Sequence, residues 1–236
     1  MNNLGQAGPF IGRDKELAVL ESIVDRAESG NGQIVMVSGS AGIGKSFLTE
    51  QLIENYAEND DVLALWARCR SAAGSPPYWP WRQLVEQYVG KADHDDVAAA
   101  ADGHIASLVN AFPELKQFAS DSDVPATGLS PAESQFQLYN HFQSFLGAAS
   151  KQSTILAIID DFHWADEDSL KLLEYLAGEV GSHRLVVSVL VRDDLKTATN
   201  CRSVNYLESA TLRGCNSTDS MLQRRLSWCM RWELAI

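Results

Sequence analysis

The segment Gly39-Ser-Ala-Gly-Ile-Gly-Lys45-Ser46 constrains the fold of this chain more than any other stretch of its sequence. It fits the pattern G-x-x-x-x-G-K-[ST] at every fixed position, and it follows a strand-like run at residues 33–38. Glycine adopts φ > 0 without steric cost, so such a loop can turn its N–H groups toward an anion, beside the positive end of the following helix. The segment therefore predicts a phosphate-binding loop between a strand and a helix, with a plain glycine-rich turn as the alternative.

Each part of this loop has a predicted role. We expect Lys45 to reach the β- and γ-phosphates of a nucleoside triphosphate and the Ser46 hydroxyl to bind Mg²⁺. The expected nucleotide-binding residues of the loop are Gly39, Ser40, Ala41, Gly42, Ile43, Gly44, Lys45, Ser46 and Phe47.

Strand-like and helical stretches alternate along the rest of the chain. Apolar runs predict strands at residues 33–38, 61–69, 154–159 and 184–191, with a weaker fifth at 209–212. Helical periodicity and end signals predict helices at residues 13–29, 45–58, 81–90, 95–110, 131–149 and 166–179. The alternation predicts an α/β fold with a parallel sheet and right-handed crossovers, in which ligands lie beyond the carboxyl ends of the strands.

Two adjacent carboxylates, Asp160 and Asp161, end the third apolar strand. Protein sites for Mg²⁺ use one or two carboxylates besides phosphate oxygens, so we expect Asp160 to bind Mg²⁺ together with Ser46. Asp161 follows directly, where it could orient or deprotonate the attacking water. The alternative is that the pair only caps the following helix or faces solvent.

Four other features each have two interpretations. Arg192 follows the fourth strand and either contacts the γ-phosphate or pairs with an aspartate next to it in the sequence. His163 is either a donor on the phosphate side or a solvent-facing loop histidine. Arg13 lies either near the nucleotide base or simply in the first turn of a helix. The aromatic and proline-rich run at residues 75–81 forms either a partner-binding surface or core filling under a loop.

Charge and composition limit the partners of the chain. The net charge of −12 argues against direct nucleic-acid binding. We expect a cytoplasmic protein without membrane contact, because no leader pattern is visible and no apolar run approaches the roughly 18 residues of a membrane helix. The 4 cysteines include no C-x-x-C pair and are expected to be structural thiols.

Five motifs, in a fixed order, resemble a known family. They are residues 10–16, the loop at 39–46, residues 75–81, Asp160-Asp-Phe-His-Trp-Ala-Asp166 and Val191-Arg-Asp193. Together they resemble the AAA-type ATPase module of the signal-transduction (STAND) class, of the origin-recognition-like variety. Such modules lie near the amino terminus of large LuxR-type transcription regulators or behind class III nucleotide cyclase domains.

The resemblance covers about residues 8–219 and implies a three-layer P-loop fold with a five-stranded parallel sheet in the order 5-1-4-3-2. It implies ATP and Mg²⁺ as ligands, a Walker A loop at residues 39–46 and a Walker B pair at Asp160 and Asp161. Arg192 matches the family's sensor arginine, and Arg13 matches its nucleotide-proximal motif. The implied catalytic residues are Lys45, Asp161 and Arg192.

The last part of the sequence departs from this family. The helical lid, superhelical repeats and DNA-binding helix-turn-helix of the family are not expected after Leu212. Residues 220–236 indicate either a changed reading frame or premature end, or a short amphipathic helix that covers the sheet edge. Because a lid excludes water from the site, its absence predicts weak ATP binding and very slow hydrolysis.

Three functions compete on this basis. The first is an ATP-binding, slowly hydrolysing switch module of a signalling regulator, with other signalling domains or self-association as further partners. The second is a nucleotide-binding or protein-interaction remnant without catalysis. The third, a small-molecule or nucleoside kinase, ranks last because no arginine-rich insert lies between the third and fourth strands.

Overall fold

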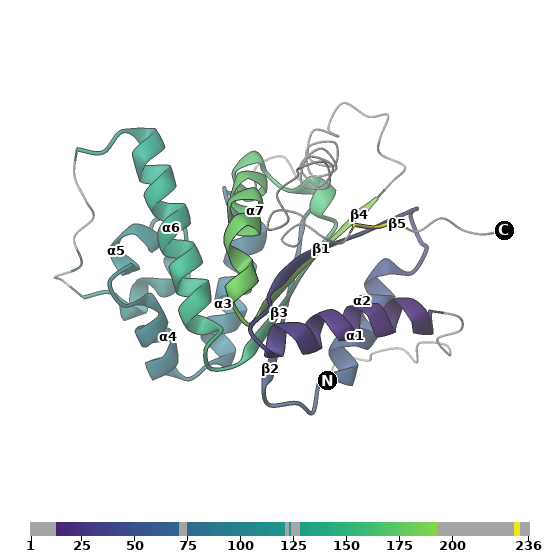
Figure 1. Ribbon diagram of the computed structural model, residues 1–236. Coiled ribbons are helices and arrows are strands. Elements are labelled where there is room, and N and C mark those ends of the chain that lie inside the picture. The colour runs from purple at the N-terminus through teal and green to yellow at the C-terminus, as the bar shows by residue number, and fades with distance from the viewer. Residues whose placement is uncertain (1–12, 71–74, 121–122, 124–127, 193–228, 232–236) are drawn as a thin grey trace, which may run out of the picture.

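The computed structural model describes residues 13–70, 75–120, 123, 128–192 and 229–231 of the chain (Figure 1). Within these ranges, no helix combines the length and the apolar character needed to cross a bilayer.

Four full strands form the centre of the fold. They are β1 (Gln33–Gly39), β2 (Val62–Arg68), β3 (Thr154–Asp160) and β4 (Leu185–Arg192). Neighbouring strands are parallel, and their order across the sheet is β2-β3-β4-β1. The predicted α/β class, the parallel sheet and the 1-4-3-2 part of the predicted strand order are therefore confirmed.

The edge of the sheet beyond β1 differs from the prediction. The weak strand expected at residues 209–212 lies outside the described residues. A three-residue strand, β5 (Cys229–Arg231), pairs in parallel with β1 at this edge instead. The described sheet thus has four full strands rather than five, and the part of residues 220–236 that reaches its edge is extended rather than helical.

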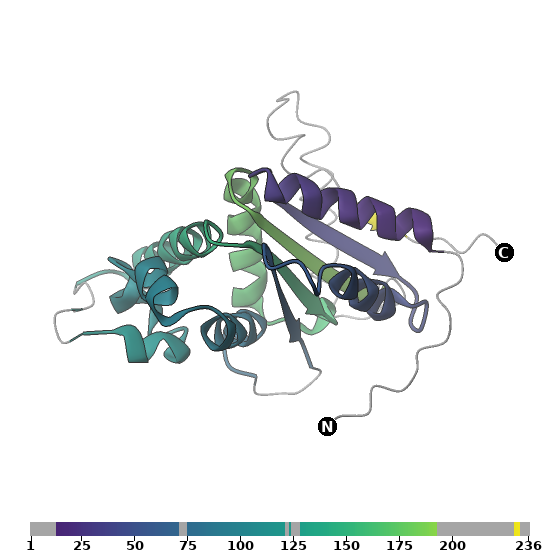
Figure 2. The same cartoon turned by 90° about the horizontal axis from the view of Figure 1, so that it is seen from below.

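Helices cover both faces of the sheet (Figures 1 and 2). One face carries α1 (Asp14–Glu28) and α2 (Lys45–Asn55), and the other carries α3 (Trp79–Lys91), α6 (Pro131–Ala149) and α7 (Glu167–Glu179). Side chains alternate along a strand, so β4 turns Val186 and Leu190 toward α1 and α2 but Val187 and Val189 toward the opposite layer. Burial on both faces explains why the strands are nearly continuous apolar runs.

The chain between β2 and β3 forms a helical region. Between α3 and α6 it contains α4 (His94–Ala101), α5 (Ile105–Leu108) and the 3-10 helix η1 (Pro113–Phe118). The single helix predicted at residues 95–110 is wrong, because Gly103 has a φ of 71° and the chain turns there. α6 begins with a capping box, in which Ser130 and Glu133 each accept a hydrogen bond from the other's backbone N–H.

Side chains of α3 cover the outer edge of β2. Gln83 exchanges two hydrogen bonds with the backbone N–H and carbonyl of Arg68, and Gln87 does the same with Trp66. Lys91 donates to a third carbonyl of the strand at 2.7 Å. The three side chains are spaced four residues apart, so one face of α3 serves alternate residues of β2. This edge is thereby closed to pairing with another strand.

The aromatic and proline-rich run belongs mostly to the core. Tyr78 and Trp81 are 8% and 1% exposed, and the Trp81 indole N–H donates to the carbonyl of Ser169 at 3.1 Å. Asp166, the N-cap of α7, accepts from the backbone N–H groups of Ser169 and Tyr78. These contacts fasten α3 to the start of α7 and favour the core-filling interpretation for both residues. Trp79 remains partly exposed.

Candidate functional site

The loop between β1 and α2 has the backbone that its glycines predict. Gly42 and Gly44 have φ values of 75° and 97°, and Gly44 is the N-cap of α2, which begins at Lys45. The ammonium of Lys45 donates to the carbonyls of Gly39 at 2.7 Å and Ser40 at 2.9 Å. Lys45 is therefore held against the start of the loop, while Ser40, Ala41, Gly42 and Gly44 are exposed to solvent.

Ser46 and Asp160 meet as the sequence predicts. The Ser46 hydroxyl donates to Oδ2 of Asp160 at 3.1 Å, across 114 residues of sequence. The Asp160 residue is only 4% exposed, and its second oxygen, Oδ1, accepts from the backbone N–H of Asp161 at 2.8 Å. β1 and β3 flank β4 in the parallel sheet, so their carboxyl ends lie at the same edge, where the helix after β1 can reach the carboxylate that ends β3.

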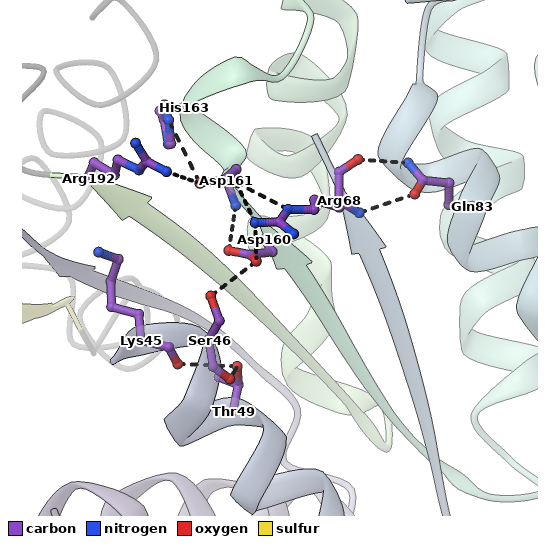
Figure 3. A network of polar contacts seen from close by, with 9 residues as sticks. All are labelled: Lys45, Ser46, Thr49, Arg68, Gln83, Asp160, Asp161, His163 and Arg192. Carbon is purple, nitrogen blue, oxygen red and sulfur yellow. Dashed lines mark hydrogen bonds and ion pairs between the residues drawn. The ribbon is translucent and has the colours of Figure 1, made fainter. Parts of the chain in front are cut away.

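Asp161 combines a left-handed backbone conformation with an ion pair on each carboxylate oxygen. It has a φ of 53°, which is uncommon for a residue other than glycine, and its side chain is 15% exposed. Figure 3 shows the contacts that run from Ser46 through Asp160 and Asp161 to two arginines. An αL residue of this kind at a strand end is typical of functional sites, where surrounding contacts hold a strained backbone.

Arg68, which the sequence analysis missed, engages Asp161 from β2. Its Nε and Nη2 atoms each donate to Oδ2 of Asp161 at 3.2 Å, and Nη2 lies 3.7 Å from Oδ2 of Asp160. Arg68 stands opposite Asp160 in the β2–β3 register. The signal for it was present, because Arg68 ends an apolar strand in the same way as Asp160 and Arg192 end theirs.

Arg192 reaches Asp161 from the opposite side. Its Nη2 lies 3.4 Å from Oδ1 of Asp161, and Arg192 stands opposite Gly39 in the β1–β4 register. The structure thus brings Arg192 to the predicted site, whereas the aspartates that follow it in the sequence lie outside the described residues. The side chain of Arg192 is 40% exposed.

Two residues with open interpretations also lie at this end of the sheet. His163, in the 3-10 helix η2 (Phe162–Trp164), is only 6% exposed, so the prediction of a solvent-facing histidine is wrong. Its Nε2 lies 4.0 Å from Oδ1 of Asp161. Arg13 donates from Nη2 to the carbonyl of Ile43 at 3.1 Å, which places it against the glycine loop.

The residues present fit a magnesium–nucleotide complex. Two glycines with positive φ shape the loop at a helix N-terminus, which is a site for anions. A hydroxyl and a buried carboxylate, Ser46 and Asp160, already lie in contact, and oxygen donors of this type suit Mg²⁺. Lys45, Arg68 and Arg192 supply positive charge around them.

Similarity to solved structures concerns the fold. The chain resembles Cdc6p from Pyrobaculum aerophilum with a TM-score of 0.51 and 13% identity, covering 98% of this chain and 47% of that one. It also resembles a chain of the Drosophila ORC bound to DNA, with a TM-score of 0.39 and 15% identity over 88% of this chain and 48% of that one. The first of these likenesses supports a shared fold and nothing finer.

One curated relative matches in sequence. It is the uncharacterized protein R02095 of Rhizobium meliloti (strain 1021), which is 24% identical over 175 residues. The match covers 70% of this chain but 17% of that protein, so the chain spans under a fifth of its relative's length. A protein-family profile described as "AAA ATPase domain" matches residues 9–189, well over half of the chain. The chain therefore belongs to the AAA ATPase domain family.

Proposed function

We propose that this member of the AAA ATPase domain family is an ATP-binding switch module that hydrolyses ATP slowly. One observation carries the proposal: Ser46, which follows the glycine loop, contacts the buried carboxylate of Asp160. In a sheet of this order, that contact joins the phosphate-binding and metal-binding halves of a nucleotide site.

The roles of the residues follow from their positions. The backbone N–H groups of the glycine loop and the ammonium of Lys45 bind phosphate oxygens, and Arg13 supports the loop through the carbonyl of Ile43. Ser46 and Asp160 would hold Mg²⁺, which, when bound, supplies positive charge to the phosphate oxygens. Arg192, beside Gly39 in register, is placed to contact the terminal phosphate.

Asp161 is the proposed base that orients or deprotonates water. Its carboxylate accepts two hydrogen bonds from Arg68 and lies 3.4 Å from Arg192. Both oxygens of this carboxylate are held by arginines, so Asp161 must leave at least one of them before it can approach a water molecule. Slow hydrolysis follows from this arrangement.

The same arrangement favours a second candidate function, nucleotide binding without turnover. If Arg68 and Arg192 keep Asp161 engaged after nucleotide binds, the module acts as a nucleotide-dependent scaffold. Both candidates share the binding site and differ only in whether Asp161 becomes available.

Hydrolysis and binding by the Asp161→Asn variant separate the two candidates. The switch proposal expects ATP turnover by the wild-type chain and its loss in Asp161→Asn, while nucleotide binding remains, since asparagine keeps the shape but cannot take a proton. Equal turnover in both proteins would refute the role of Asp161. Binding without turnover in either protein would favour the scaffold.

The biological setting belongs to the proposal as well. We propose that the module serves a signal-transduction regulator and that its further partners are signalling domains or other copies of the module, without direct nucleic-acid contact. The motifs at residues 10–16, 39–46 and 160–166 support this setting by their order. The preference for ATP over GTP also rests on that resemblance.

A further inference from the structure

A cavity lies at the carboxyl end of β2, on the side of α3 and η2. Its volume is about 240 Å³. Residues from four separate segments line it, among them Arg70, Ser75, Trp79, Pro80, Trp164 and Ala165. None of these residues has a role in the nucleotide site proposed above.

Two tryptophans form the walls of this cavity. Trp79 and Trp164 are both partly exposed, whereas Trp81 of the same aromatic run is buried in the core. Partly exposed indole faces beside Pro80 and Ala165 offer a flat apolar surface on which an aromatic ring can stack. Trp164 also packs against the hydrophobic core, and the guanidinium of Arg82 lies 6.0 Å from the centroid of the Trp79 ring.

A cation, Arg70, and a carboxylate, Asp166, both line the cavity. Arg70 is exposed, and no hydrogen bond or ion pair joins it to another residue in the part of the chain that the structure describes. Both carboxylate oxygens of Asp166 already accept hydrogen bonds, from the backbone N–H of Tyr78 and from the N–H and hydroxyl of Ser169. Burial and the surrounding carboxylates raise the pKa of the Cys69 thiol to about 12, so Cys69 adds no negative charge at neutral pH.

We propose that this cavity binds a small planar aromatic anion, whose ring stacks between Trp79 and Trp164 and whose acid group pairs with Arg70. The volume is below the roughly 300–1,000 Å³ of pockets for drug-sized ligands, so the occupant is no larger than a bicyclic acid. An arginine fork also suits a carboxylate through two parallel hydrogen bonds. This site goes beyond the proposed function.

The test uses indole-3-acetate as the probe and tryptamine, a cation with the same ring, as the matched ligand. Each is titrated into the full chain while the indole N–H signals of its 6 tryptophans are followed by ¹⁵N NMR. Trp79→Phe and Trp164→Phe assign the two signals that matter. We expect saturable shifts of these two signals with indole-3-acetate and little shift of the Trp81 signal. Tryptamine is expected to bind at least about tenfold more weakly.

Two variants and one control make the result specific. Ala165→Leu fills the cavity and is expected to abolish the shifts. Arg70→Gln changes an exposed side chain and is expected to leave the fold intact. It should weaken the binding of indole-3-acetate by about tenfold and leave the binding of tryptamine unchanged. Arg26→Gln removes the same charge from α1, on the opposite face of the sheet, and is expected to change nothing.

Three results would overturn the proposal. The first is the absence of saturable shifts at Trp79 and Trp164 up to about 10 mM probe, a concentration at which even millimolar affinity would be visible. The second is equal binding of indole-3-acetate and tryptamine. The third is binding by Arg70→Gln that matches binding by Arg26→Gln.

Discussion

Substitution of Arg68 tests how the proposed base is controlled. Arg68 donates two hydrogen bonds of 3.2 Å to Asp161, yet its side chain is 58% exposed. Exposed ion pairs contribute about 0–1 kcal/mol, because water and salt screen them. Release of Asp161 by Arg68→Gln is therefore worth at most about 1 kcal/mol, which corresponds to a rise of about two- to fivefold in turnover. Gln83 bonds the backbone of Arg68 and not its side chain, so the strand edge remains intact.

Phosphate release under single-turnover conditions measures this effect, with Arg26→Gln on α1 as a charge-matched control. The reasoning predicts faster release in Arg68→Gln and no change in the control. A fall of about tenfold or more in Arg68→Gln would refute it. Such a fall would mean that Arg68 stabilises the reacting phosphate rather than restraining Asp161.

Three further predictions concern stability. Gly32→Ala is expected to destabilise the fold by about 3 kcal/mol in urea titrations, because its Cβ would lie 2.5–2.6 Å from three backbone oxygens. Gly90 lies in α3, and a Cβ added there would meet nothing within 4 Å, so Gly90→Ala should raise the free energy of unfolding by about 0.5–1 kcal/mol. Equal changes in stability for Gly32→Ala and Gly90→Ala would contradict this reasoning. Gln87→Leu removes both hydrogen bonds to the β2 edge and should cost about 1–2 kcal/mol, and an unchanged urea midpoint would show that water replaces them. Burial and the neighbouring His104 lower the pKa of His141, so the unfolded chain takes up a proton more readily, and unfolding free energy should fall as pH drops through about 6.5. His141→Gln should flatten this pH dependence, and an unchanged slope would contradict the assignment.

The strands and the glycine loop could be predicted because their signals are local. The glycine spacing fixes the backbone between β1 and α2, and buried parallel strands require long apolar runs. The pairing of Ser46 with Asp160 could be predicted as well, since both follow strands of one parallel sheet. Local patterns were therefore sufficient to predict the glycine loop. The Ser46–Asp160 pair also required the rule that ligands lie at the carboxyl ends of parallel strands.

Other features depend on contacts that the sequence does not encode locally. Arg68 was missed because its proximity to the Asp160–Asp161 pair depends on the β2–β3 register. That register is known only once the two strands are aligned in the sheet. His163 had two interpretations from the sequence, and the solvent-facing one is wrong because η2 buries the side chain. Gly103 divides the helix expected at 95–110 because it adopts positive φ, whereas an isolated glycine in a helical pattern is often tolerated.

Calorimetric titration with Mg-ATP tests the central claim most directly, with wild-type chain and Lys45→Ala side by side. The Lys45 ammonium donates to the loop carbonyls of Gly39 and Ser40, so its replacement is expected to leave the strands and their packing in place. The account predicts saturable binding by the wild type and a loss of at least about a hundredfold in Lys45→Ala, with both proteins equally folded by circular dichroism. A folded wild-type chain that does not bind Mg-ATP, or that binds it equally well without Lys45, would contradict the account.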